Sequence, residues 1–305
     1  MTNPRAALLI FVLALVWGCN WPVLKMGVTE LAPLTFRGLT LPLAAAGMLF
    51  VSRLCGDSIR IPRALWPRLI VLAFFNITGW NGFLLFGVQQ LPAGRSAILG
   101  YTMPIWATMI AALVLDEPIS RRKLLGLALG FAGMAVLIGE QIVVVRAAPF
   151  GALMIITAAI LWAYGTVLLR KWQPPAPQNA LSGWMMLLGW IPLAMVAPFF
   201  DSQPLVTELA HLSHRGWFAI IYNIFFAGTV ANLAWFMLAR TLPVAVSSLS
   251  SLPVPVVGVI SGMILLGERP GWPEWVALGL VVVALFIVMF HPSDRHAAAS
   301  LAPDD

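Results

Sequence analysis

Apolar stretches of about 20 residues, separated by short polar joins, recur along the whole chain. A hydrocarbon core about 30 Å thick needs that length of helix at a rise of about 1.5 Å per residue. The longest joins, 54–68 and 201–216, are too short to hold a soluble domain. The pattern predicts an all-α membrane protein with ten transmembrane helices at 6–27, 34–53, 69–90, 94–115, 122–139, 149–170, 180–200, 217–239, 244–266 and 273–290.

The amino-acid composition agrees with a membrane protein. Hydrophobic residues make up 60% of the sequence and charged residues 10%, against about 25% charged in a soluble domain. The two cysteines, Cys19 and Cys55, offer neither a disulfide framework nor a metal site. The net charge of +6 comes from basic residues that lie singly or in short clusters between apolar runs. That distribution indicates membrane topology and argues against nucleic acid as a partner.

The basic residues also predict the orientation of the chain. With the N-terminus inside, 12 of the 18 lysines and arginines fall on inner connections. This excess favours both termini in the cytoplasm, and an even number of spans agrees. The apolar run after Arg5 is longer than a signal-peptide core and lacks a clean cleavage site, so we expect a retained first span.

Landmark residues of the first half recur in the second half at a fixed offset of 151. A shared offset across such different residues indicates a duplicated unit. We therefore divide the chain into repeats of five helices at 1–143 and 144–305. Five crossings are an odd number, so the second repeat must be inverted in the membrane, with a ligand site expected where the halves meet. The pairs are Trp66 with Trp217, Phe74-Phe75 with Phe225-Phe226, Asn81 with Asn232, Pro92 with Pro243, Ser96 with Ser247, Pro104 with Pro255, and Glu117 with Glu268.

Uncharged polar residues and aromatic residues gather near the predicted mid-depth of the membrane. An amide buried in hydrocarbon without a partner costs several kcal/mol, so these side chains must face other helices or water. Hydrogen bonding between helices is one interpretation, and the lining of a central cavity is the other. For the set as a whole we favour the cavity, and its members are Trp17, Asn20, Trp21, Asn76, Trp80, Asn81, Trp162, Tyr164, Asn223 and Asn232.

Prolines inside the fourth and ninth spans predict a matched pair of interrupted helices. Pro104 and Pro255 each remove a hydrogen bond and free the carbonyl four residues earlier, at Gly100 and Ser251. Simple kinks that serine hydroxyls satisfy are the alternative. Recurrence of the device in both halves favours backbone that is presented to a ligand. We therefore add to the candidate substrate-binding residues Gly100, Tyr101, Ser248 and Ser251.

The sequence places no acidic side chain near the mid-depth of the membrane. All twelve acidic residues fall at span ends, in loops or in the tail. No protease, nucleophile or phosphate-loop motif is present, so the sequence predicts neither an enzyme nor a cofactor or metal site. Lys25, Arg37 and Arg170 lie near helix ends, where snorkelling to the headgroups explains them, and attraction of a substrate carboxylate is the lesser alternative.

The combined pattern resembles the EamA-type branch of the drug/metabolite transporter superfamily. The similarity rests on Trp17-Gly18 with a basic residue at the end of the first helix, and on the proline-centred fourth helix followed by Asp116-Glu117-Pro118. The second copy repeats it as Pro255 and Gly267-Glu268-Arg269-Pro270, although Ala163 replaces the glycine after Trp162. The resemblance implies a carrier of the bacterial inner membrane that works by alternating access.

Within that branch the chain is most similar to ten-span amino acid exporters, including those for aromatic amino acids. We therefore expect a secondary transporter that exports small metabolites, with amino acids as leading substrates and no obligate protein partner. A multidrug or organic-cation exporter of the same fold is one alternative, and a small-solute channel is another. The energetic coupling stays open, and with no buried acid facilitated export fits better than proton antiport.

Overall fold

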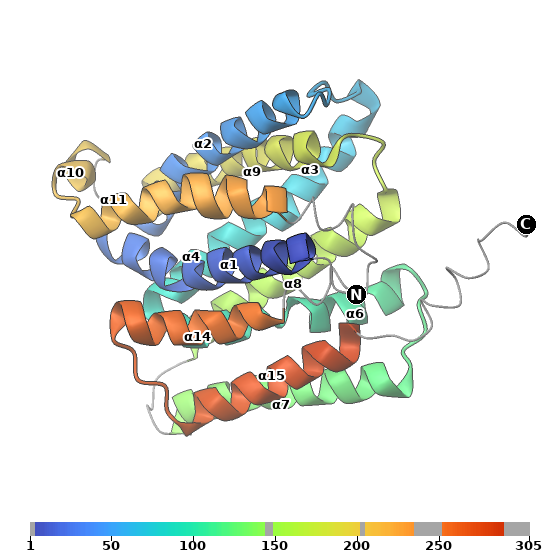
Figure 1. Ribbon diagram of the computed structural model, residues 1–305, viewed down its shortest axis with the longest axis vertical. Helices are drawn as coiled ribbons and strands as arrows, with labels where there is room; N and C mark the ends of the chain where they lie inside the picture. Colours follow the sequence, from blue (N-terminus) through green and yellow to red (C-terminus); the bar gives the residue numbers. More distant parts are fainter. Residues whose placement is uncertain (1–3, 144–148, 202–204, 235–251, 290–305) are drawn as a thin grey trace, which may run out of the picture.

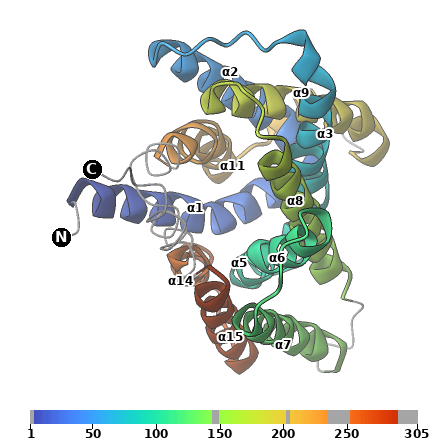
Figure 2. The ribbon, with the colours of Figure 1, turned by 90° about the vertical axis from the view of Figure 1, so that its right-hand side faces the viewer.

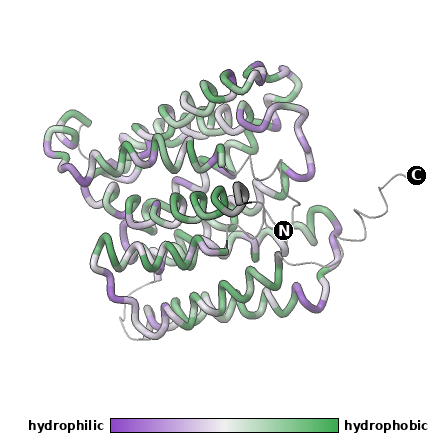
Figure 3. Tube along the Cα trace, in the orientation of Figure 1, coloured by the Kyte–Doolittle hydropathy of each residue, from purple (hydrophilic) through white to green (hydrophobic). Residues whose placement is uncertain are grey.

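The protein is a bundle of long apolar helices (Figure 1). The computed structural model describes residues 4–143, 149–201, 205–234 and 252–289. Within these ranges eight helices are long and apolar enough to cross a membrane, two shorter apolar helices accompany them, and no strand occurs. The prediction of an all-α membrane protein is confirmed. Hydrophobic residues cover the length of the helices, and hydrophilic residues concentrate at their ends (Figure 3).

The first half contains five spans. Its third span begins at Arg63, six residues before the predicted start. Its fourth span is divided into two helices. The elements are α1 (Pro4–Glu30), α2 (Pro33–Leu54), η1 (Arg63–Leu65), α3 (Trp66–Ala73), η2 (Phe74–Gly79), α4 (Trp80–Gln90), α5 (Ala93–Gly100), α6 (Met103–Val114) and α7 (Arg121–Val143).

The helices of the second half run in the direction opposite to that of their counterparts in the first half. The end of the predicted span 217–239 and the start of the span 244–266 lie outside the described residues. A short helix, α10, lies in the join 201–216, where the sequence predicts none. The elements are α8 (Phe150–Trp172), α9 (Gln178–Phe200), α10 (Leu205–Ala210), α11 (His214–Ile221), η3 (Tyr222–Val230), α14 (Pro253–Leu266) and α15 (Trp272–Met289).

Helices of the two halves alternate around the molecule. α2 packs on α9, α1 on α14, α4 on α8, and α7 on α15. The pair α7 and α15 lies at one edge of the bundle and α2 with α9 at the opposite edge (Figures 1 and 2). The start of α1 and the end of α15 lie on the same side. We call that side the Pro4 end and the opposite side the Glu30 end.

The third span of each repeat contains a π-helix, η2 and η3. Moving η2 by the repeat offset of 151 places it at 225–230, inside η3. A π-helix spaces its hydrogen bonds one residue wider than an α-helix, and such segments often occur at functional sites. The equivalent residues Asn81 and Asn232 make equivalent bonds, from Nδ2 to the carbonyls of Ile77 (2.8 Å) and Gly228 (3.0 Å). The duplication thus extends to a local distortion of the backbone and the side chain that stabilises it.

Small residues let α14 approach both α1 and α5. A Cβ on Gly18 would lie 2.4 Å from Cγ1 of Val257, and a Cβ on Gly258 would lie 2.7 Å from the Cβ of Ala97. Small residues at such crossings allow backbones in a membrane to pack closely. The second half is thereby held against the first on the side where the fourth span is interrupted.

Candidate functional site

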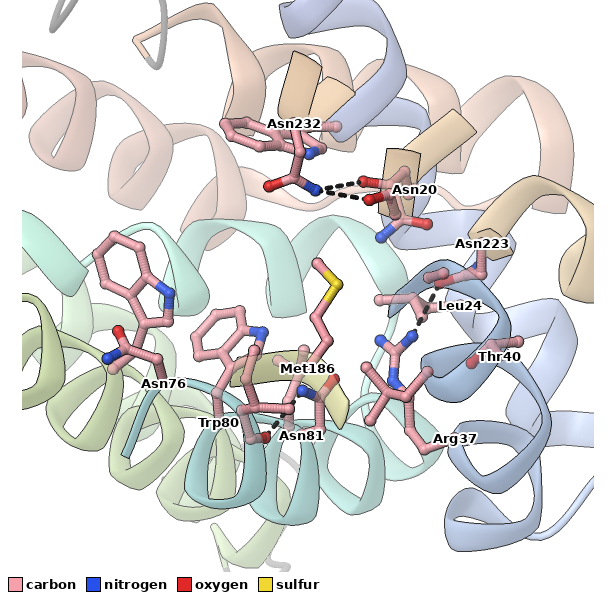
Figure 4. A pocket seen from close by; sticks show the side chains of 18 of the residues that line it. Asn20, Leu24, Arg37, Thr40, Asn76, Trp80, Asn81, Met186, Asn223 and Asn232 are labelled. Carbon is pink, nitrogen blue, oxygen red and sulfur yellow. Dashed lines mark hydrogen bonds between the residues drawn. The ribbon is translucent and has the colours of Figure 1, made fainter. Parts of the chain in front are cut away.

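A cavity of about 250 Å³ lies between the two halves. Figure 4 shows its wall, with Arg37, Asn81 and Trp80 on one side and Asn20 and Asn232 on the other. Residues of both halves contribute: Trp17, Asn20, Trp21, Leu24, Arg37, Thr40, Leu41, Ala44, Asn76, Ile77, Trp80, Asn81, Leu84, Tyr101, Met103, Trp162, Met186, Asn223, Ala227, Gly228 and Asn232. The cavity therefore occupies the region where inverted repeats meet.

Most of the residues that the sequence singled out lie in this wall. They are Trp17, Asn20, Trp21, Asn76, Trp80, Asn81, Tyr101, Trp162, Asn223 and Asn232. Ser248 and Ser251 lie outside the described residues. Gly100 and Tyr164 are not in the wall. The Tyr164 ring packs instead on Phe75, with ring centroids 4.7 Å apart, in a separate apolar cluster.

Gly100 affects the cavity indirectly, through the position of the Trp21 indole. A Cβ there would lie 2.3 Å from Cη2 of Trp21, so only glycine lets that indole reach its position. Trp21 in turn meets the ring of Tyr101 edge-on, with centroids 6.2 Å apart. Such edge-to-face pairs are a favoured aromatic geometry. The glycine thus permits two aromatic side chains to form one part of the wall.

The fourth span is interrupted beside the cavity. α5 ends at Gly100, and α6 begins at Met103, which places Pro104 in the first turn of a new helix. Thr102 stabilises the junction, since its hydroxyl donates to the carbonyl of Leu99 at 2.6 Å. In the second half, Pro255 likewise lies in the first turn of α14. The junction presents Tyr101 and Met103 to the cavity.

The wall asparagines bond mainly to their own helices. Besides Asn81 and Asn232, Asn76 donates to the carbonyl of Leu72 (3.1 Å) and Asn223 to that of Ala219 (3.1 Å). Hydrogen bonding between helices, one of the two interpretations of the sequence, accounts only for Asn76 with Thr166 and for Asn223 with Arg37. Among the described residues, the side-chain oxygens of Asn81 and Asn232 receive no hydrogen bond, so they are left to accept one from a solute.

The side-chain oxygen of Asn20 is buried without a partner among the described residues. An unsatisfied buried acceptor costs roughly 1–3 kcal/mol. Because this Oδ1 is inaccessible, it is not presented to a solute in the cavity.

Indole rings form the apolar part of the wall. Trp80 of α4 and Trp162 of α8 lie with ring centroids 6.4 Å apart and planes tilted by 55°. Trp17 and Trp21 of α1 line the same cavity. Flat faces of this kind stack on aromatic or aliphatic groups.

Arg37 is the residue that sequence reasoning placed wrongly. It does not snorkel to the headgroups: it is 7% exposed and lies in the cavity wall. Its Nη1 donates to Oδ1 of Asn223 at 3.0 Å. A sequence signal did exist, because 37, 40, 41 and 44 share one helical face that carries a threonine as well as the arginine. All four positions line the cavity.

Carboxylates at the Glu30 end join the two halves. Glu268, which follows α14, accepts hydrogen bonds from the backbone N–H groups of Ala93 (2.5 Å) and Gly94 (3.0 Å). A negative charge is favourable at the start of a helix, here α5. Similar contacts join Glu30 to Ser213, Asp201 to Thr35, Glu208 to Ala32, and Glu274 to Arg95. Each of these contacts links one half to the other.

The chemistry of the cavity is that of a binding site. No aspartate or glutamate is among the described residues of its wall. In the described part of the chain, no group of histidine, cysteine and acidic side chains could hold a metal ion. The wall combines aromatic surface, neutral amides and one arginine, which can bind and orient a small solute.

Comparison with known proteins identifies the family. The EamA-like transporter family matches residues 4–139 and again residues 149–290. Two curated relatives, from Salmonella typhimurium and Escherichia coli, are each named "Probable amino-acid metabolite efflux pump". They are 28% and 27% identical and cover 92% and 94% of this chain, and 94% and 95% of their own lengths.

Other similar proteins agree with that result. An uncharacterized Bacillus subtilis transporter, YoaV, is 23% identical over 91% of this chain and 92% of its own length. A protein of known crystal structure superposes with a TM-score of 0.65 at 19% identity, covering 94% of this chain and 98% of that one, which shows the shared fold. The chain belongs to the EamA-like transporter family.

Proposed function

We propose that this membrane transporter exports amino acids, including aromatic ones, by alternating access. The observation that carries the proposal is the composition of the cavity, in which indole rings, neutral amides and a buried arginine surround about 250 Å³ between the halves. The two relatives named as amino-acid metabolite efflux pumps support it. A space of that size suits one small metabolite.

The wall would recognise the two parts of such a solute separately. Trp80 and Trp162 would contact an aromatic or apolar side chain through their faces. The amide oxygen of Asn81 would accept a hydrogen bond from its ammonium group. Such a site is permissive toward side chains, which suits an exporter that meets several amino acids.

The contacts at the Glu30 end support a rocking motion of one half against the other. Opening that end would require Glu268 to leave Ala93 and Gly94, and Glu30 to leave Ser213. Since each of these contacts joins the halves, movement of one repeat breaks them together. We place both termini in the cytoplasm from the excess of basic residues on that side, so that the Glu30 end faces outward.

Transport in this proposal is facilitated and runs downhill. Among the described residues, the titratable groups of the wall are Arg37 and Tyr101, and neither type ordinarily changes charge near neutral pH. Proton antiport would need an acid outside the wall, such as Glu30 or Glu140. Glu30 accepts a hydrogen bond from Ser213, and Glu140 forms an ion pair with Arg95. We therefore expect export that a pH gradient does not drive.

Reconstitution in proteoliposomes tests the proposal. Counterflow of radiolabelled tryptophan, phenylalanine, methionine and threonine would be measured with and without a pH gradient, against empty liposomes. Saturable counterflow of at least one amino acid supports the proposal. Transport of an organic cation such as tetraphenylphosphonium without any amino acid would favour the multidrug alternative. Electrical conductance above carrier rates would favour a channel.

A further inference from the structure

Arg37 lies inside the molecule with most of its hydrogen-bonding capacity unused. A guanidinium has five N–H donors. Among the described residues, Nη1 is bonded to Oδ1 of Asn223, and Nε is buried without a partner. The guanidinium carbon lies 5.6 Å from the ring centroid of Phe36, a contact that adds a modest cation–π attraction. Figure 4 shows the side chain directed from α2 toward Asn223 at the edge of the cavity.

The charge of Arg37 has no counter-ion in the part of the chain that the structure describes, because no carboxylate there lies within 4.0 Å of its nitrogens. The acids that act on the start of α2 are Asp201 and Glu208. They bind the backbone N–H groups of Thr35 (2.5 Å) and Ala32 (3.3 Å) and form no ion pair with Arg37. Arginine does not lose its proton in proteins, so the positive charge remains.

An uncompensated buried cation beside a cavity calls for an anion from outside the chain. Intramembrane charges are costly, and those that line a pathway mark the sites of ligands or ions. We propose that Arg37 binds the carboxylate of the transported solute through charge-assisted hydrogen bonds. The inference rests on the proposed export of amino acids and names the group that carries their recognition.

The position of Arg37 also orients the solute. Arg37 lies four residues from the start of α2, about 6 Å from the Glu30 end, whereas Asn81 lies nine residues from the end of α4, about 13 Å from it. The carboxylate would therefore point toward the Glu30 end. The ammonium group would point toward the amide oxygens deeper in the cavity. Asn223 holds the guanidinium in place for this contact.

The contact between α2 and η3 makes the pairing possible. A Cβ on Gly228 would lie 2.6 Å from the Cβ of Ala44, and one on Gly47 would lie 2.8 Å from Oγ1 of Thr229. These small residues bring α2 of the first half against η3 of the second half. The carboxylate site is thus shared between the two halves, so a solute bound there contacts both.

Binding to the purified protein provides the test. Cavity tryptophans allow ligand binding to be followed by quenching of their fluorescence. The probes are phenylalanine, 3-phenylpropionate, which keeps only the carboxylate, and phenylalaninamide, which lacks it. We expect Arg37→Gln to weaken phenylalanine and 3-phenylpropionate by at least about tenfold, the usual size for loss of a hydrogen bond to a charged group, and to leave phenylalaninamide unchanged.

Two further variants keep the test independent of folding. Arg37→Lys retains the charge without the planar fork and should show an intermediate loss. Arg122→Gln removes an equal charge from an exposed position on α7 and should leave all three affinities unchanged. Equal weakening of all three probes in Arg37→Gln would overturn the proposal, and so would unchanged affinity for the two carboxylates.

The outcomes separate this inference from the proposed function. If the wild-type protein binds 3-phenylpropionate through Arg37 but shows no counterflow of any amino acid, the carboxylate site is supported and amino acid export is contradicted. If the wild-type protein and Arg37→Gln transport phenylalanine equally well, export is supported and the carboxylate site is contradicted.

Discussion

Two arginines are equally buried in this protein and have opposite surroundings. Arg37 and Arg95 are each 7% exposed. Arg95 forms ion pairs with two carboxylates: its Nη1 lies 2.8 Å from Oε2 of Glu140, and its Nε donates to Oε1 of Glu274 at 3.0 Å. The hydrogen-bond partner of Arg37 among the described residues is the neutral amide of Asn223. The two arginines are therefore equally buried but differ in whether a carboxylate lies beside the charge.

The difference separates a structural charge from one that is available to a ligand. Arg95 joins α5 to α7 and α15, and Glu274 also accepts from the N–H of Gly271 at 3.0 Å. Every charge in this group has a partner within the protein, so the group stabilises one arrangement of the helices. Arg37 lines the cavity and has no such partner. Removal of each arginine should therefore have opposite consequences for folding and for transport.

Arg95→Met should cause the largest loss of stability. It would leave the partly buried Glu140 and the buried Glu274 without their cation, and breaking a buried pair costs about 3–5 kcal/mol. Thermal or denaturant unfolding in detergent would measure the loss. The triple variant with Glu140→Gln and Glu274→Gln should recover part of it, because no unpaired charge remains. A single variant as stable as the wild type would show that these ion pairs contribute nothing to folding.

Trp80→Ala should affect the apolar part of recognition. Trp80 lies in the wall beside Trp162, and its loss removes stacking surface for a side chain. We expect transport of phenylalanine to fall about tenfold, close to the value of about 1.5 kcal/mol for an aromatic contact. Binding of phenylalaninamide should fall equally, unlike in Arg37→Gln. Selective loss of carboxylate probes would remove the distinction between the indole and the guanidinium.

Arg37→Met should leave stability within about 1 kcal/mol of the wild type, or raise it. Replacement of a buried, incompletely paired charge by an apolar side chain of similar length is often neutral or stabilising. Parallel unfolding of Arg37→Met and Arg95→Met under the same conditions measures the contrast directly. A destabilisation of Arg37→Met as large as that of Arg95→Met would show that Arg37 is also a structural charge.

Two signals in the sequence allowed the fold to be predicted. Apolar runs of membrane length mark the spans, and the offset of 151 relates the halves through Asn81 and Asn232, which make equivalent bonds. The asparagines and aromatic residues of the wall were predictable because neutral amides and aromatic rings at mid-depth must face a cavity or another helix. These inferences need only the depth of a residue and the face of its helix.

The remaining features depend on contacts between helices that periodicity does not specify. Arg37 and Arg95 both lie near helix ends, where snorkelling explains a basic residue equally well. Only the approach of α2 to η3 buries Arg37, and only the meeting of α5, α7 and α15 surrounds Arg95 with acids. Tyr164 lies close to Trp162 in the sequence, but its ring packs on Phe75 outside the cavity wall.

Glu208, like Arg37, forms no ion pair with the described residues, and its surface position makes it the less consequential of the two. Burial raises the pKa of the Glu208 carboxyl above its usual value, the N–H of Ala32 lowers it, and the charge of Asp201 raises it again. Because the folded state holds this proton more tightly than the unfolded state, the stability contributed by Glu208 increases as pH falls through the raised pKa and is lowest at higher pH.

Glu208→Gln should therefore raise stability slightly at pH 8 and make almost no difference near pH 3, where a glutamate is almost fully protonated in both the folded and the unfolded state. The glutamine oxygen can still accept from Ala32, so the gain should stay below about 0.5 kcal/mol, the usual size at a surface. Unfolding at the two pH values measures it, with wild-type protein as the reference. A loss at pH 8 would mean that the charged bond to Ala32 outweighs burial. In that case an unpaired charge in this protein would not by itself indicate strain, and the same reasoning for Arg37 would rest on its position in the cavity alone.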